Sequence, residues 1–143
     1  MDWTLHIDPA VNCAFIKRPG AYESCDTYEV LNAMVNHPDH REDTNILYDA
    51  RDLRIPSVEP FKSMSESYKL ITQIYSNKAD TCRSAIVVGD AQNYAKAHQY
   101  IVSGRLDKST VERKVFRDFE KAKAWLNIPK HYEIVFHSHG EAA

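Results

Sequence analysis

Cysteine is scarce in this sequence, and its spacing matches no metal or redox motif. The chain of 143 residues has three cysteines, Cys13, Cys25 and Cys82, and no two of them form a CxxC pair. A zinc ribbon and a thioredoxin-type redox site are therefore unsupported. We expect three reduced thiols, at least two of them packed in the interior, as is usual for a cytoplasmic protein.

Net charge and long apolar runs are lacking as well. The formal net charge is -2, which provides no broad field for attracting nucleic acid. No apolar stretch approaches the roughly 20 residues that span a bilayer, and the N-terminus lacks the basic start and apolar run of a signal peptide. We expect a cytoplasmic protein that has no transmembrane segment and does not bind nucleic acid.

Glycine and proline are few, and most of them separate segments of secondary-structure length. The sequence has four glycines and six prolines, and neither an internal repeat nor a low-complexity linker divides it. Its 43% of hydrophobic residues and 27% of charged residues are ordinary for a globular protein. We predict one α/β domain over residues 1–130, followed by a C-terminal arm or tail over residues 131–143.

Five segments have the composition of strands. The first two form a hairpin around Asp8-Pro9, and the segment from Ser84 to Val88 lacks polar alternation, which is typical of a central parallel strand. The predicted strands cover residues 3–8, 11–17, 45–49, 84–88 and 113–116.

Four segments show helical periodicity, over residues 24–35, 60–75, 91–103 and 119–126. The first has Tyr28, Leu31 and Val35 on one stripe. The third is expected to begin at an Asp90 cap, end at Gly104 and bury His98 as a core histidine, and Asp118 is expected to cap the fourth. The predicted apolar face of the third helix holds Ala91, Tyr94, Ala95, His98, Ile101 and Val102. The order β-β-α-β-α-β-α-β-α predicts a mixed sheet of about five strands with four helices.

Catalytic, cofactor and metal motifs are missing. The sequence has no GxGxxG, GxxxxGK[ST] or GxSxG, so nucleotide binding and a serine-hydrolase elbow have no support. Two histidine clusters, His37/His40 and His137/His139, are far apart and read as solvated loop and tail rather than as a zinc site. We predict no cofactor, no metal and no catalytic residue.

Two regions remain candidates for binding. Ligands of α/β sheets gather beyond the carboxyl ends of parallel strands, which indicates the loop with Asp49, Arg51 and Asp52 and the turn Gly89-Asp90. The predicted helix 60–75 is rich in aromatic and methionine side chains, which line adaptable apolar pockets. We expect an apolar site formed by Phe61, Met64 and Tyr68 of this helix together with Tyr94.

Three segments in order and spacing are similar to SpoIIAA-like proteins, bacterial relatives of the STAS domain of anti-sigma factor antagonists. They are ILYDARDL (46–53), SAIVVGDAQNYAKAHQY (84–100) and KVFRDFEKAKAWL (114–126). The resemblance implies a mixed sheet with helices and a family that binds protein partners or small apolar ligands, many members having no known function. The Asp-Ser-Ser/Ala-Gly-like turn of STAS phospho-switch proteins is absent, and Ser57 and Ser63 are the phosphorylation candidates in the matching region.

The sequence thus favours a non-enzymatic STAS-like binding or regulatory module for a protein partner or a small apolar, lipid-like ligand. The alternative is a small hydrolase or transferase that uses the carboxylates at the strand ends. Whether the chain forms a homodimer stays open.

Overall fold

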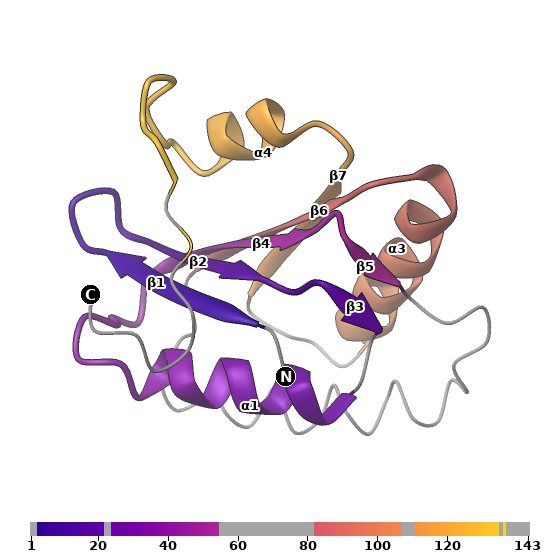
Figure 1. Ribbon diagram of the computed structural model, residues 1–143, viewed down its shortest axis with the longest axis horizontal. Coiled ribbons are helices and arrows are strands. Elements are labelled where there is room, and N and C mark those ends of the chain that lie inside the picture. Colours follow the sequence, from indigo (N-terminus) through magenta and orange to yellow (C-terminus); the bar gives the residue numbers. More distant parts are fainter. Residues whose placement is uncertain (1–2, 22–23, 55–81, 107–110, 135, 137–143) are drawn as a thin grey trace.

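A computed structural model describes residues 3–21, 24–54, 82–106, 111–134 and 136 (Figure 1). The helix predicted over residues 60–75 lies outside these ranges, as does the histidine pair of the tail. No helix within the described ranges is long and apolar enough to cross a membrane.

The predicted mixed sheet of five strands is confirmed. Its order is β1 (Thr4–Asp8), β2 (Cys13–Lys17), β4 (Asn45–Ala50), β6 (Arg83–Val88) and β7 (Glu112–Phe116). The β1–β2 hairpin is antiparallel, and every other neighbouring pair is parallel. The central strands β4 and β6 are buried along most of their length, in keeping with their apolar composition.

Two further strands of two residues each were not predicted. β3 (Gly20–Ala21) pairs in parallel with β5 (Leu53–Arg54). Two residues separate β3 from the end of β2, and two separate β5 from the end of β4, so this small ladder extends the β2–β4 pairing past a break. Segments this short have no recognisable period in the sequence, which is why periodicity missed them.

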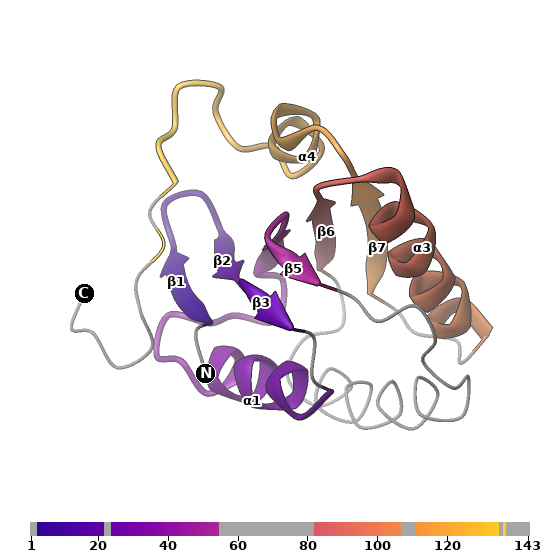
Figure 2. The same ribbon diagram turned by 45° about the vertical axis from the view of Figure 1, so that its right-hand side comes forward.

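Three helices lie within the described residues and cover both faces of the sheet (Figures 1 and 2). α1 (Ser24–Val35) and α3 (Ala91–Leu106) lie on one face, and α4 (Phe119–Trp125) lies on the other. α4 begins at an Asp118 cap whose side chain accepts from the N–H groups of Glu120 and Lys121, as predicted.

Each face of the sheet has its own apolar packing. Under α1, the buried side chains include Ile16, Met34 and Ile46, while Ala97 of α3 packs with Val88 and Val115. The opposite face packs Cys13, Phe15, Leu47, Ala85 and Val87 against α4 and the segment after it. Cys13 and Cys82 are buried free thiols, one in each of the two larger clusters.

The described residues that follow α4 pack back onto the sheet. Residues 129–134 and 136, here called the arm, form no strand. Its side chains Tyr132, Ile134 and Phe136 are half-buried against the cluster that contains Phe15. The arm thereby shares the cover of this face with α4.

The predicted face of α3 is wrong over residues 91–98, and the side chains of Ile101 and Val102 lie outside the described part of the helix. Ala91, Tyr94, Ala95 and His98 are exposed, whereas Asn93 and Ala97 are buried. The Asn93 side-chain amide donates to the Leu53 carbonyl at 3.2 Å, which turns the helix so that Asn93 and Ala97 face the sheet. α3 also continues past Gly104, and Tyr28 of α1 is exposed rather than part of the core stripe.

Candidate functional site

The carboxyl edge of the parallel strands is shaped by a bulge after β4. Lys17 pairs with Asp49 and Gly20 pairs with Leu53. The three-residue advance from Lys17 to Gly20 therefore lies opposite a four-residue advance from Asp49 to Leu53, which leaves one extra residue on the second segment. The Asp49 carbonyl accepts from the Arg18 N–H at 3.1 Å, and the Asp52 carbonyl accepts from the Gly20 N–H at 3.1 Å. A bulge re-aims the side chains of the extra turn, which here are those of Arg51 and Asp52.

Asp49 and Arg51 form the central polar contact of this edge. The Asp49 side chain is 2% exposed and accepts from Arg51 Nε and Nη2, each at 2.9 Å, while its Oδ1 also accepts the Arg51 N–H at 3.2 Å. The hydrogen bonds to Asp49 raise the pKa of Arg51 above its usual value. A buried carboxylate therefore fixes a bidentate guanidinium whose other side stays half-exposed.

Two ring contacts set the surroundings of these charges. The Arg51 guanidinium lies over the ring of Phe119 in α4, 4.5 Å from its centroid. The neighbouring Lys17 ammonium lies 5.9 Å from the centroid of Phe136 in the arm. Because a cation over an aromatic face is attracted to it, both contacts hold basic side chains at the border between sheet and α4 or arm.

Gly89 and Asp90 link the bulge to α3. A Cβ placed on Gly89 would lie 2.7 Å from the Arg51 carbonyl oxygen, so only glycine permits this approach of the two loops. Asp90 Oδ1 accepts the Asn93 N–H at 2.7 Å, which confirms Asp90 as the cap of α3. The predicted loops of β4 and β6 thus meet through their backbones.

Tyr94 and His98 lie on the solvent side of α3, one turn beyond this junction. Tyr94 is 39% exposed. Its ring is nearly parallel to that of His98, with an interplanar angle of 5° and centroids 6.1 Å apart. His98 is therefore no core histidine: the pair is a stacked aromatic surface, which the predicted apolar stripe of α3 had placed in the interior.

Arg18 was not anticipated as part of this edge. It is only 4% exposed, and its Nη1 donates to the Tyr48 hydroxyl at 2.6 Å. The sequence signal was weak, because a basic residue between a strand and Pro19 reads as a solvated strand end. This edge of the sheet therefore has a buried arginine, Arg18, in addition to the half-exposed Arg51.

The remaining candidates divide in two. Asp49, Arg51, Gly89 and Asp90 come together, with Asp52 and Tyr94 beside them on the surface. The other candidates lie outside the described residues, and they are Ser57, Phe61, Ser63, Met64 and Tyr68. In the described ranges, no three His, Cys, Asp or Glu side chains are grouped as a metal site would require. His37 accepts the Asp39 N–H at Nδ1 instead.

Comparisons with known proteins give one structural match. No protein-family model matches the sequence, and no curated protein is significantly similar to it. The structure is similar to that of an uncharacterized protein of the DUF3478 family from Shewanella loihica PV-4, described as having a SpoIIAA-like fold. The two share 13% identity with a TM-score of 0.55, over 88% of this chain and 95% of the other. The chain therefore has the SpoIIAA-like fold that its sequence segments predicted.

Proposed function

We propose that this chain is a non-enzymatic binding module of STAS-like type whose partner is a protein. The proposed interface, here called the edge surface, runs from the bulge to the start of α3 and consists of Arg51, Asp52, Asp90, Tyr94 and His98. The observation that carries the proposal is the exposed Tyr94–His98 stack on the solvent side of α3, one turn beyond the junction of Arg51 and Gly89. Tyrosine and arginine are enriched among the residues that contribute most to protein interfaces.

The stacked pair suits a protein interface because it is already ordered. Each ring restrains the other, so less side-chain freedom is lost when a partner covers them. Arg51 is restrained in the same way by Asp49 and Phe119. A partner would meet rigid groups rather than mobile surface chains, and pre-organisation of this kind raises affinity without further contacts.

The same contacts give little support to the alternative, a small hydrolase or transferase. Both oxygens of Asp49 accept from the Arg51 guanidinium. Asp90 caps α3, and Asp118 caps α4. These carboxylates hold backbone and side chains in place, whereas a general acid–base pair would have to converge on a substrate.

The choice of a protein over a small apolar ligand also has a structural reason. Of the residues proposed for an apolar pocket, Tyr94 is the one within the described ranges, and it is exposed on the outer side of α3. A ring in this position is accessible to another surface. Whether that surface belongs to a second copy of the chain or to a different protein is decided by the experiment below.

Photo-crosslinking tests the proposal. A photoreactive benzoylphenylalanine replaces Tyr94 in one sample and Tyr28 in a matched control, because Tyr28 of α1 is 44% exposed. We expect irradiation to yield one discrete adduct from position 94, with the mass of a second copy or of one other protein, and none from position 28. The same adducts from both positions, or none from position 94, would contradict a partner at the edge surface.

A further inference from the structure

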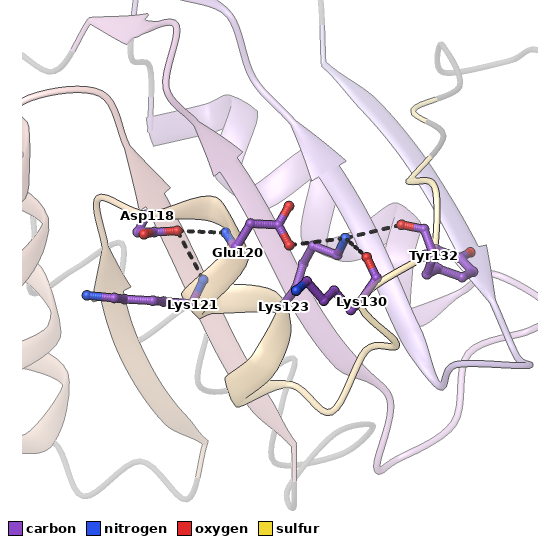
Figure 3. Close-up of polar contacts among 6 residues, drawn as sticks. All are labelled: Asp118, Glu120, Lys121, Lys123, Lys130 and Tyr132. Carbon is purple, nitrogen blue, oxygen red and sulfur yellow. Dashed lines mark hydrogen bonds and ion pairs between the residues drawn. The ribbon is translucent and has the colours of Figure 1, made fainter.

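The arm is tied to the molecule mainly by side chains. The Lys123 ammonium of α4 donates to the carbonyls of Lys130 at 3.4 Å and of Tyr132 at 3.2 Å, and it pairs with Glu120 at 3.6 Å (Figure 3). Its side chain is 7% exposed. At the other end of the contact, the Tyr132 hydroxyl donates to the Asp8 carboxylate of β1.

Between these two ties lies the apolar contact. The ring of Tyr132 stacks on Phe15 with centroids 5.7 Å apart, and Phe15 stacks in turn on His6 at 6.4 Å. The arm packs on the cluster that contains Cys13, Phe15 and Leu47, all fully buried, and these three residues are here called the arm face. Burial and the hydrogen bond to Asp8 raise the pKa of the Tyr132 hydroxyl, and Cys13 belongs to the cluster against which Tyr132 packs.

The arm lacks the main-chain bonds that hold a strand. Within its described residues, the single backbone–backbone hydrogen bond is the local one from the Tyr132 N–H to the Pro129 carbonyl. Pro129, Lys130, His131 and Glu133 are exposed, and the three apolar side chains are half-buried. Since no ladder joins it to the sheet, the arm can leave without breaking the pairing of β1 with β2.

We propose that the arm is an internal ligand of the arm face, and that this face accepts in its place an extended segment of a protein partner. We expect the partner segment to have side chains like those of the arm, because both would fill the same face. The side chains that pack on the cluster are Tyr132, Ile134 and Phe136, at every second position, and the first is a tyrosine whose hydroxyl reaches Asp8. Extended peptides are commonly recognised through such alternate side chains. This interface is separate from the edge surface and does not rest on it.

Competition from the attached arm should keep the face closed in the resting chain. A tethered segment acts at an effective concentration near the millimolar range, so a free peptide of similar sequence competes poorly. Weakening the ties of the arm should therefore admit the free peptide. The natural thiols report this opening, because Cys13 lies under the arm while Cys82 lies in the core of the opposite face.

The experiment uses the full chain with Cys25→Ser, so that two thiols remain. Lys123→Met removes the ammonium but keeps an unbranched apolar side chain. Lys121→Met is the matched control, because Lys121 is exposed on the same helix and its side chain points away from the arm (Figure 3). Alkylation of each thiol by a neutral reagent is followed by mass spectrometry, and binding of the peptide PKHYEIVF (residues 129–136) is followed by fluorescence anisotropy.

We expect Lys123→Met to speed alkylation of Cys13 but not of Cys82, and to bind the peptide about tenfold more tightly than Lys121→Met does. Added peptide should protect Cys13 again, whereas the same peptide with alanine in place of tyrosine should not. If Lys123→Met does not fold, Tyr132→Phe replaces it, because that change removes only the hydroxyl that reaches Asp8. Equal protection of Cys13 in all variants, or an open Cys13 that the peptide neither binds nor protects, overturns the proposal.

Discussion

Asp8 connects the first strand to the last described segment of the chain. Its carboxylate accepts from the Tyr132 hydroxyl and from the Ala10 N–H. These bonds lower its pKa, with the Tyr132 hydroxyl as the largest cause. The charged form of Asp8 is thus the form that holds both the arm and the turn between β1 and β2.

A dependence of stability on acid pH follows from this shift. Because the pKa of Asp8 is lower in the folded chain, its contribution is fully present above its unfolded pKa of about 4 and is lost as the pH falls through the folded value. Tyr132→Phe should remove most of this contribution. We expect urea unfolding to show a smaller loss of stability for Tyr132→Phe than for the wild type between neutral and acid pH; parallel curves would contradict the assignment.

Asp49 and Arg51 should respond unequally to substitution. Arg51→Ala leaves a carboxylate that is 2% exposed without its counter-charge, which we expect to cost about 3 kcal/mol of unfolding free energy. Asp49→Asn leaves a half-exposed guanidinium that water can solvate, so its cost should be about 1–2 kcal/mol. Chemical denaturation of both variants measures the order, and a larger loss for Asp49→Asn would refute this account of the pair.

At the scale of elements, α3 shows how a polar residue can set the rotation of a helix. The Asn93 N–H is capped by Asp90, and its side-chain amide donates to the buried Leu53 carbonyl. Ala97, one turn later, is small enough to approach the cluster of Val88 and Val115 closely. The rings of Tyr94 and His98 are consequently directed to solvent.

Asn93→Ala tests this role. It leaves the Leu53 carbonyl unpaired in the interior, and we expect a loss of about 1–3 kcal/mol. Gln92→Ala, at the exposed neighbouring position, should change the free energy of unfolding by no more than about 0.5 kcal/mol. Thermal melts of the two variants distinguish them, and an Asn93→Ala variant as stable as Gln92→Ala would show that other contacts fix the helix.

The sequence was a good guide wherever composition and burial agree. The segment Ala85 to Val88 of β6 is apolar on both faces, and β6 lies in the interior of the sheet between β4 and β7, as this composition predicts. The caps Asp90 and Asp118 were predictable because a short carboxylate before a helix accepts from the free backbone N–H groups of the first turn. The loops of β4 and β6 were identified as neighbours because parallel strands end at a common edge.

Features that depend on distant contacts were not predictable. The apolar stripe of α3 pointed the wrong way because the bond from Asn93 to Leu53 joins residues far apart in sequence. Lys123 is buried by the arm that folds back over it, although a lysine in a charged helix normally reads as exposed. The bulge after β4 depends on pairing between β3 and β5, which are too short to show a pattern.

At the scale of the whole molecule, one sheet joins two apolar layers. Trp3 packs in the layer of α1, and Trp125 packs against the layer of α4 and the arm. They are the two tryptophans of the chain, so each layer has its own fluorescent probe. Because both layers use side chains of β2, β4 and β6, we propose that they unfold as one cooperative domain.

Single-tryptophan variants measure this cooperativity. Trp125→Phe leaves Trp3 as the probe, and Trp3→Phe leaves Trp125. With each variant, urea unfolding followed by fluorescence should coincide with the loss of secondary structure measured by circular dichroism. A fluorescence midpoint clearly separated from the circular dichroism midpoint in either variant would show two independently unfolding parts.

The role of the edge surface is tested most directly by native mass spectrometry of freshly purified protein. We predict that the wild type and Tyr28→Ala retain a second copy or another protein, and that Tyr94→Ala gives the bare chain, because truncating an interface tyrosine commonly weakens binding about tenfold or more. A complex of equal abundance in Tyr94→Ala, or a wild type that carries no partner, would contradict a protein-binding module that acts through Tyr94.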